Sequence, residues 1–391
     1  MMKTIAFVHN TFPNGGSEKV TLDIAEGLSQ KGFNVIVLCR DFRPLLMPEN
    51  CPIKVLTYKN RLKEKASAWE IIEYVHNEGI SVLTYVYFQP YFTSLIRKET
   101  GCQIVFADHS SPFWLARAKN EGRARMANAG FGKKLCWHLW YKPLIKILHY
   151  YDRREQRKCK KLLNVVDAYI VLCNAYSEEI TNILYLNEPT HNKIRVIPNY
   201  QEPNDNPKLK KEHVVLYVGR LTYADKRVDR MLHIWKRVEE QAPEWRLEIV
   251  GDGEEEEKLK ALAEELQLKR VSFEGRQQPQ QYYNNAAILC LTSTFEGWGL
   301  VLTEAQTNGV VPIAFACSAG VETIMKPSGE NGILVNPFDE DEYSIHLLSL
   351  LKDEQLRRKI QQNVLKKKYP KQKTIDLYAE LYQNLTNNKN K

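Results

Sequence analysis

The segment Thr294-Phe295-Glu296-Gly297-Trp298-Gly299-Leu300-Val301-Leu302-Thr303-Glu304-Ala305 places two carboxylates on either side of a glycine-containing turn. The apolar run Ile288-Leu289-Cys290-Leu291 before it has the length of a buried strand. Helical periodicity begins at Leu300 and continues to Asn308-Gly309, a common helix stop, after which another strand-like run starts. The pattern therefore predicts strand, glycine turn, helix and strand, as in a parallel α/β sheet.

The glycine turn and Glu304 both indicate a ligand with phosphate and hydroxyl groups. Gly297 and Gly299 precede the first unpaired amides of the predicted helix, where a residue without Cβ lets a phosphate approach the positive end of the helix dipole. Glu304 lies one turn after Leu300 and Val301 on an apolar face, where an unpartnered charge is costly. Vicinal hydroxyls of a nucleotide-activated sugar would supply partners. The alternative is a structural turn followed by one internally paired, buried glutamate.

Composition favours a two-domain protein of a reducing compartment. The 391 residues, 43% of them hydrophobic, exceed one ordinary domain. The eight cysteines include no C-x-x-C pair, and Cys39, Cys102, Cys173 and Cys290 lie in or beside apolar runs, where cysteine acts as a small buried side chain. No stretch has the roughly 18 to 20 apolar residues of a membrane span, and the run from Ile5 to Val8 is too short for a signal peptide. We expect a cytoplasmic protein, soluble or peripheral on a membrane.

Strand-like and helix-like runs alternate through both halves of the chain, which is typical of parallel sheets with crossover helices. The expected strands of the first half are 5–9, 35–39, 54–58, 82–87, 103–107 and 169–173. Those of the second half are 214–218, 247–250, 271–273, 288–291, 311–315 and 333–335. Between the halves, the segment from Pro198 to Pro207 holds three prolines and no aliphatic residue, which indicates a linker.

Glu296 and Glu304, with Gly-Trp-Gly-Leu between them, form an E-x7-E pattern, and five further segments accompany it along the chain. They are Gly15-Gly16-Ser17-Glu18; Ala107-Asp108-His109; Lys193-Ile194-Arg195-Val196-Ile197-Pro198-Asn199; Val218-Gly219-Arg220-Leu221 with Lys226; and Ile249-Val250-Gly251-Asp252-Gly253 followed by Val271-Ser272-Phe273-Glu274-Gly275. Together the six motifs resemble the family 4 retaining glycosyltransferases over nearly the whole chain. The resemblance implies an α/β chain of the GT-B fold: two Rossmann-like, doubly wound domains facing across a cleft, with a C-terminal helix that crosses back to the first.

The resemblance also divides the chain. Residues 1–198 would form the N-terminal, acceptor-side domain, with a basic aromatic insertion at 111–161. Residues 199–207 would be the linker, 208–365 the C-terminal domain that binds the sugar nucleotide, and 366–391 the C-terminal helix and a polar tail.

Roles for individual residues follow from the resemblance as well. Arg220 and Lys226 would stabilise the departing nucleoside diphosphate, Glu296 would contact hydroxyls of the donor sugar, and Glu304 would contact those of the ribose. His109, after an apolar strand, would face the reacting sugar; a structural histidine is the alternative. The remaining expected donor-binding residues are Gly15, Gly16, Arg276, Gln277, Gly297, Trp298, Gly299 and Leu300.

The positions of Arg220 and Lys226 in the chain also support their role at the diphosphate. Arg220 ends a strand and Lys226 precedes a predicted helix, where both could stabilise a developing negative charge. The alternative is ordinary surface charge in a chain with 55 basic residues. The family usually has glycine after this lysine. Arg227 stands there instead, which should crowd the turn and offers a further phosphate ligand.

Two other motifs are interpreted as structural. Gly251-Asp252-Gly253 follows a strand as in a dinucleotide fingerprint, but Glu256 replaces the third glycine and Glu254 to Glu257 would repel a pyrophosphate, so we expect an acidic helix start. Asp339-Glu340-Asp341 is formally a D-x-D metal motif, yet its place in a polar turn before a helix favours capping. No His/Cys cluster has metal-ligand spacing, so we expect no metal and no cofactor besides the sugar-nucleotide co-substrate.

The segment from Ser111 to Lys161 contains fourteen basic and three acidic residues, a net charge of +11 against +8 for the whole chain. Its aromatic residues are Trp114, Phe131, Trp137, Trp140, Tyr141, Tyr150 and Tyr151. Cations with interfacial aromatics suit an anionic membrane surface. The alternative is a solvated basic insertion with its aromatics packed inward. Nucleic acid would fit the charge, but the sugar-nucleotide motifs argue against it.

The resemblance implies a retaining hexosyl- or N-acetylhexosaminyl-transferase that uses a UDP- or GDP-sugar. The expected acceptor is a lipid-linked glycan or other oligosaccharide in bacterial surface polysaccharide synthesis (lipopolysaccharide, capsule or O-antigen), at the inner face of the cytoplasmic membrane. Two alternatives stay open. One is a sugar-nucleotide epimerase or another GT-B enzyme, and the other is a noncatalytic membrane- or polyanion-binding module.

Overall fold

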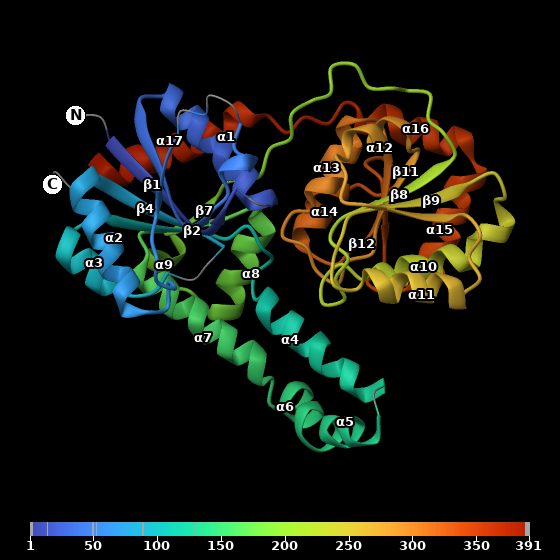
Figure 1. Cartoon of the computed structure of the whole chain (residues 1–391), viewed down its shortest axis with the longest axis horizontal. Helices are drawn as coiled ribbons and strands as arrows, with labels where there is room; N and C mark the ends of the chain where they lie inside the picture. The colour runs from blue at the N-terminus through green and yellow to red at the C-terminus, as the bar shows by residue number, and fades with distance from the viewer. Residues whose placement is uncertain are drawn as a thin grey trace. The chain divides into compact units, whose positions relative to one another are not determined.

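Two parallel β-sheets organise the structure, each with helices as crossover connections (Figure 1). The computed structural model describes residues 3–13, 15–48, 51, 53–87, 90–128 and 130–387. The chain divides into two units. The first comprises Met1–Phe113, Asp152–Tyr200 and Pro370–Lys391, and the second comprises Trp114–Tyr151 and Gln201–Tyr369.

The sheet of the first unit has the strand order β3-β2-β1-β4-β5-β6-β7. Its strands are β1 (Lys3–Phe12), β2 (Phe33–Phe42), β3 (Lys54–Thr57), β4 (Ile80–Val86), β5 (Gln103–Ala107), β6 (Ala168–Val171) and β7 (Ile194–Val196). The helices outside the insertion are α1 (Gly16–Gln30), η1 (Pro44–Leu46), α2 (Lys65–Glu78), α3 (Thr93–Thr100), α8 (Asn174–Leu184) and α9 (Glu188–His191). The central strand β1 buries Ile5 to Val8 without alternation, as strands covered on both faces do.

The C-terminal helix α17 (Lys371–Asn387) packs against α1 and β4 of the first unit (Figure 1). Ile375 fills the space beside Gly27, where an added Cβ would lie 2.3 Å from Ile375 Cδ1. The Tyr382 hydroxyl lies 2.8 Å from Thr84 Oγ1 in the interior. The helix therefore returns to the first domain, as expected from the family resemblance.

The sheet of the second unit has the order β10-β9-β8-β11-β12-β13. Its strands are β8 (Val214–Val218), β9 (Arg246–Val250), β10 (Val271–Gly275), β11 (Ile288–Leu291), β12 (Val311–Phe315) and β13 (Ile333–Val335). Its helices are α10 (Val228–Val238), η4 (Glu239–Gln241), α11 (Glu256–Glu265), α12 (Gln280–Asn285), α13 (Leu300–Thr307), α14 (Ala319–Met325), α15 (Glu340–Lys352) and α16 (Glu354–Val364). The two parallel sheets confirm the doubly wound α/β class.

An insertion of helices connects β5 to β6. It contains α4 (Trp114–Ala124), η2 (Arg125–Asn128), α5 (Phe131–Cys136), the π-helical turn η3 (Trp137–Tyr141), α6 (Lys142–Lys146) and α7 (Tyr150–Val165). No helix within the described residues is long and apolar enough to cross a bilayer.

The order of strands reverses at one place in each sheet. β1 lies between β2 and β4, and β8 lies between β9 and β11. Ligands of open α/β sheets bind outside the carboxyl ends of the strands at such a switch point. The residues that follow β8 and β11 therefore occupy the position where a ligand of the second unit is expected.

Candidate active site

The loop after β8 carries the cations Arg220 and Lys226 and an aspartate, Asp225, that pairs with Arg220. Arg220 is 70% exposed, and its guanidinium donates a hydrogen bond of 2.8 Å to Asp225 Oδ2. The same carboxylate accepts a hydrogen bond from the Thr222 hydroxyl. Asp225 also links this loop to the next one, because its carbonyl accepts a 2.7 Å bond from the amide of Thr294.

Lys226 and Glu296 form an ion pair at this place. The distance from Lys226 Nζ to Glu296 Oε1 is 2.6 Å, and the two side chains are only 19% and 10% exposed. The Ser293 hydroxyl donates a second hydrogen bond of 2.7 Å to the same oxygen. The pair joins residues 70 positions apart because β8 and β11 are neighbours in the sheet. The sequence-predicted residues Lys226 and Glu296 therefore lie together at the switch point.

Buried polar contacts of Thr292 and Arg230 stabilise the loop that carries Glu296. The Thr292 hydroxyl donates to the carbonyl of Arg227 at 3.1 Å. The buried Arg230 donates to the Thr292 carbonyl and the Thr294 hydroxyl at 3.5 and 3.4 Å, and its guanidinium lies 4.3 Å from the ring centre of Phe338. Arg230 has no motif signal of its own, so sequence reasoning missed its supporting role.

The glycine turn leads into α13 as expected. Gly299 is the N-cap residue with φ 83°, a left-handed conformation that favours glycine. A Cβ there would also lie 3.1 Å from Leu302 Cδ1. Gly297 and Leu300, the first residue of α13, are half-buried. Trp298 is buried at 5% exposure, and its indole Nε1 has no hydrogen-bond partner among the described residues. The turn thus joins Glu296 to the N-terminus of α13 and contains one buried donor without a partner in the described part of the chain.

Glu304 has a hydrogen-bond partner within the protein, Tyr283. The hydroxyl of the buried Tyr283 in α12 donates a hydrogen bond of 2.7 Å to Glu304 Oε2. Burial, followed by the neighbouring carboxylate, raises the pKa of Tyr283, so this hydroxyl keeps its proton. One carboxylate oxygen is therefore used to orient the side chain. Tyr283 is 21 positions away in a different helix, so no local pattern could have revealed it.

Gly251 and Gly253 position the Arg220 loop. A Cβ on Gly251 would lie 1.9 Å from the Gly219 carbonyl oxygen, and one on Gly253 would lie 2.4 Å from that of Leu221. The Leu221 amide donates to the Asp252 carbonyl at 2.8 Å, so the two loops touch through their backbones. The helix that follows begins at Glu256 with acidic residues in its first turn, as expected. The glycines serve close packing between neighbouring loops.

Three weaker candidates are placed differently from the Lys226–Glu296 pair. Arg227 has φ 51°, and its guanidinium is bound to both oxygens of Asp229 and lies 4.4 Å from the Tyr223 ring centre. Arg276 and Gln277 are exposed after β10, which β9 separates from β8. Gln277 donates to the Glu274 carbonyl at 3.4 Å. The contacts of Arg227 give little support to the expectation that it binds phosphate.

His109 lies in the first unit, after β5. Burial lowers its pKa to about 4, against the opposing effect of a hydrogen bond with Asn199. Its Nδ1 is buried and has no hydrogen-bond partner in the part of the chain that the structure describes. His109 is therefore neutral near pH 7 and retains one ring nitrogen for a ligand.

His9 lies beside His109, as the sequence did not predict. Burial and then the charge of His109 lower the pKa of His9 to about 3. His9 Nε2 lies 3.0 Å from the Thr21 hydroxyl, and its Nδ1 lies 3.9 Å from Glu18 Oε1. Gly15 has φ 150°, and a Cβ there would lie 2.7 Å from Glu18 Oε2, while Gly16 is the first residue of α1. The glycine loop and the two histidines thus belong to one end of this sheet.

The D-x-D motif is structural. Asp339 caps α15, with its side chain accepting a 2.9 Å hydrogen bond from the amide of Glu342. Asp341 pairs with Arg237 at 3.0 Å. No group of His, Cys, Asp or Glu that could hold a metal ion occurs within the described ranges. The expected capping role of Asp339 is confirmed.

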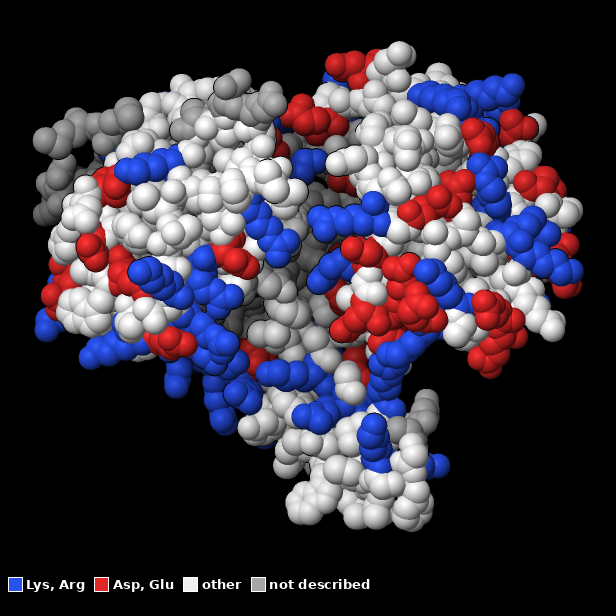
Figure 2. All heavy atoms as spheres, viewed as in Figure 1, with Lys and Arg blue, Asp and Glu red and all other residues white. Residues whose placement is uncertain are grey.

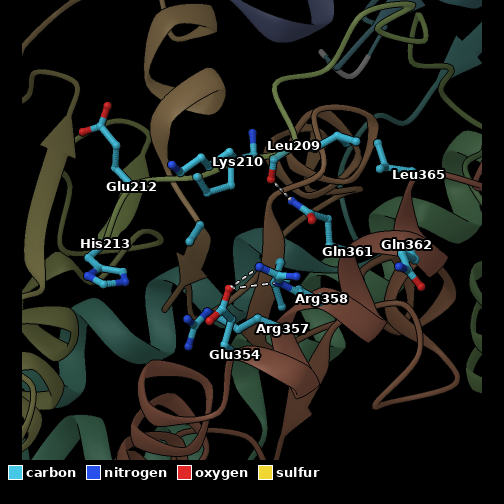
Figure 3. Close-up of a pocket in the computed structure, with 13 residues that line it drawn as sticks. Leu209, Lys210, Glu212, His213, Glu354, Arg357, Arg358, Gln361, Gln362 and Leu365 are labelled. Carbon is cyan, nitrogen blue, oxygen red and sulfur yellow. Dashed lines mark hydrogen bonds and ion pairs between the residues drawn. The ribbon is translucent and has the colours of Figure 1, made fainter.

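A pocket of the second unit lies at the other end of the sheet from this site (Figure 3). Its wall is formed by the segment before β8, the first residue of β12 and α16. Lys211 Nζ there donates to the carbonyls of Tyr283, Asn284 and Asn308, and burial with nearby Lys208 lowers its pKa to about 8. Arg358 pairs with Glu354 at 2.7 Å. Lys211 thus binds carbonyls at the C-terminal ends of α12 and α13, and Arg358 pairs within α16, both at the amino ends of the strands.

Known proteins resemble the chain over both halves. The family model "Glycosyltransferase Family 4" matches residues 14–200, and "Glycosyl transferases group 1" matches residues 200–367. The amylovoran biosynthesis glycosyltransferase of Erwinia amylovora is 36% identical over 162 residues, which are 40% of this chain and 44% of the relative. A lipopolysaccharide 1,6-galactosyltransferase of Salmonella typhimurium is 29% identical over 216 residues, 52% and 56% of the two chains. The chain spans about half the length of the curated relatives it matches.

Solved structures share the fold from end to end. Anabaena Alr3699/HepE in complex with UDP and glucose has a TM-score of 0.72 at 16% identity, over 98% of this chain and 100% of that one. The apo form of the lipopolysaccharide outer core galactosyltransferase WaaB has a TM-score of 0.65 at 22% identity, over 99% of both chains. Because the two family models together match residues 14–367 and the fold agrees, the chain belongs to the family 4 glycosyltransferases of the GT-B fold.

Proposed function

We propose that the protein transfers a glycosyl group from a nucleoside diphosphate sugar to an acceptor hydroxyl, with retention of anomeric configuration. The observation that carries this proposal is the Lys226–Glu296 pair, 2.6 Å apart at the reversal of strand order between β8 and β11, with Arg220 on the same loop as Lys226. A cation beside a sugar-binding carboxylate is the arrangement that this reaction needs. Negative charge develops on the departing diphosphate while the sugar is held by its hydroxyls.

The diphosphate would be bound without a metal ion. Arg220 and Lys226 supply two positive charges, and the first amides of α13 supply hydrogen-bond donors at the positive end of the helix. The bond from the sugar carbon to the diphosphate oxygen breaks as the acceptor oxygen bonds to that carbon on the same face. The leaving phosphate oxygen can take up the proton of the acceptor hydroxyl.

The sugar and ribose would be held by the two glutamates. Glu296 is oriented by Lys226 and Ser293, and its carboxylate would accept hydrogen bonds from sugar hydroxyls. Glu304 is oriented by Tyr283 through Oε2, so Oε1 can accept from a ribose hydroxyl. A neutral His109 would contribute a ring nitrogen toward the reacting sugar.

For the substrates, we propose a UDP- or GDP-activated hexose or N-acetylhexosamine and a lipid-linked glycan of a bacterial surface polysaccharide. The support for the donor is the UDP complex of a protein with this fold. The support for the acceptor is the similarity to proteins of amylovoran and lipopolysaccharide synthesis. The basic insertion supports a location at the inner, anionic face of the cytoplasmic membrane.

The experiment that tests the proposal compares two matched arginines in the second unit. Arg220 is 70% exposed and pairs with Asp225 at 2.8 Å, and Arg358 is 71% exposed and pairs with Glu354 at 2.7 Å, at the opposite end of the sheet. A thermal-shift screen against sugar nucleotides first identifies the donor. Arg220→Ala should then lower kcat for release of the nucleoside diphosphate by about a hundredfold, whereas Arg358→Ala should leave it unchanged. Equal turnover in the two folded variants would refute the diphosphate assignment.

A further inference from the structure

The end of the insertion exposes an apolar surface. Phe131, Trp140 and Ile147 are 84%, 73% and 71% exposed. Leu135, Leu139 and Leu148 are exposed as well. Phe131, Leu135 and Leu139 follow one another at intervals of four, which puts them on one face of a helix. We call these six side chains the apolar tip. Apolar residues this concentrated on a surface usually mark a binding site.

The apolar tip is not needed for the insertion's own packing. Trp137 and Ile145 are buried at 7% and 5% exposure. Tyr141 lies under the Arg123 guanidinium at 4.4 Å, and Tyr151 lies under Lys119 at 5.7 Å. Some aromatics of the segment therefore pack inward, as the structural alternative expected, while Phe131 and Trp140 face outward.

Cations accompany the apolar tip and acidic residues do not. The sequence contains no Asp or Glu between Glu121 and Asp152. Lys133, Lys134, Lys142 and Lys146 are all exposed on α5 and α6. In Figure 2 the surface at the end of the insertion is largely uncharged, with Lys and Arg side chains beside it. An apolar surface whose own segment carries cations and no acidic residue is complementary to a bilayer interface with anionic headgroups.

We propose that the apolar tip inserts into the interfacial layer of an anionic bilayer while the four lysines contact lipid headgroups. The inference deepens the proposed function, since it names the element that would bring the enzyme to a lipid-linked acceptor. Two signals act together here, and neither is strong alone. The lysine contribution is screened by salt over a Debye length, whereas the contribution of buried apolar area is not.

The contributions of the lysines and of the apolar tip to vesicle binding can be measured separately. If lysines alone held the protein, high salt would remove it from anionic vesicles and neutral vesicles would never bind it. With insertion of the apolar tip, weak binding to phosphatidylcholine vesicles remains, and binding to vesicles that also contain phosphatidylglycerol keeps a salt-resistant part. Each large side chain that inserts about half its surface should contribute about tenfold in partitioning.

The test is sedimentation of the full chain with both kinds of vesicle. Phe131→Ser and Trp140→Ser should each lower partitioning about tenfold on both kinds, and the change should persist in high salt. The matched controls are Leu45→Ser and Ile345→Ser, whose side chains are 97% and 68% exposed outside the insertion, and neither should change partitioning. Replacing Lys133, Lys134, Lys142 and Lys146 with Glu should remove only the salt-sensitive part.

The outcomes separate this inference from its alternatives. Unchanged sedimentation of Phe131→Ser and Trp140→Ser would overturn it. So would conversion of an oligomer to a monomer in these variants without a change on vesicles, since a second copy of the chain would then cover the apolar tip. The variants should still bind the sugar nucleotide and transfer to a water-soluble acceptor. Vesicle binding by a protein that binds no sugar nucleotide would instead refute the proposed function and leave membrane insertion intact.

Discussion

Replacing Lys226 with methionine removes the cation of the ion pair and keeps most of its aliphatic volume. Glu296, at 10% exposure, would then lose its paired positive charge but keep the 2.7 Å hydrogen bond from the Ser293 hydroxyl. Loss of one partner of a fully buried pair costs about 3–5 kcal/mol. Because Lys226 is 19% exposed and Ser293 remains, we expect the free energy of unfolding to fall by about 2 kcal/mol.

A second change separates this structural cost from catalysis. Glu296→Gln in the Lys226→Met background removes the carboxylate charge that Lys226 had balanced, and the amide oxygen can still accept from Ser293. The free energy of unfolding in urea should therefore return to within about 1 kcal/mol of the parent. Turnover should not return. Without the cation at the diphosphate, kcat should stay about a hundredfold or more below the parent.

The assay is nucleoside diphosphate release per folded molecule, measured with Lys226→Met, Glu296→Gln and the double variant. A double variant that regains turnover together with stability would refute the reasoning, because Lys226 would then serve only to neutralise Glu296. Normal kcat in Lys226→Met, once the folded fraction is taken into account, would have the same meaning.

Three other outcomes are expected. Glu304→Gln and Tyr283→Phe should weaken nucleotide affinity about fivefold or more while changing kcat little, because ribose contacts exist equally in ground and transition states; calorimetry that finds unchanged affinity would contradict a ribose role. Chelator should leave transfer intact, and loss of activity that Mg²⁺ or Mn²⁺ restores would contradict binding of the diphosphate by Arg220 and Lys226 alone. Below pH 6.5 the unfolded chain protonates its histidines while folded His109, with pKa about 4, stays neutral, so stability should fall as the pH is lowered. Between pH 6.5 and 5, the free energy of unfolding of His109→Gln, measured by urea titration, should fall by about 2 kcal/mol less than that of the parent. Burial raises the pKa of Asp108 to about 6, which partly offsets the fall in both proteins. Equal slopes of unfolding free energy against pH would show that His109 is not held neutral.

The pattern of apolar and polar residues along the chain was sufficient to predict much of the fold. The expected strands 103–107, 214–218, 288–291, 311–315 and 333–335 have the bounds of the structure. Uninterrupted apolar runs between polar turns carry that information within a few residues. β1 and β2 extend beyond the expected 5–9 and 35–39, because the residues on either side of the apolar runs still pair with each other, from Lys3 with Phe33 to Phe12 with Phe42. The three-residue β7 (Ile194–Val196) was not among the expected strands, since it is too short to show a period.

The candidate site was predictable where its residues are close in sequence. The spacing of Gly297 and Gly299 before a helix already located the turn, and Gly299 does adopt the left-handed conformation. Tyr283, Asp225 and Arg230 were missed because a tyrosine, an aspartate or an arginine in a helix or turn carries no sign of the distant group that it will contact. Only their hydrogen bonds show that they orient the site.

By itself, the sequence determined the two alternating α/β halves, the glycine turn and the excess of positive charge in the insertion, because each depends on residues a few positions apart. The tertiary structure decided the rest. It placed β11 beside β8, which brought Glu296 to Lys226 across 70 residues, and it sent Trp137 inward but Trp140 outward within one turn of the same helical run. Periodicity specifies that a face is apolar, but which strand is the neighbour and which side chain stays exposed depend on how distant elements pack.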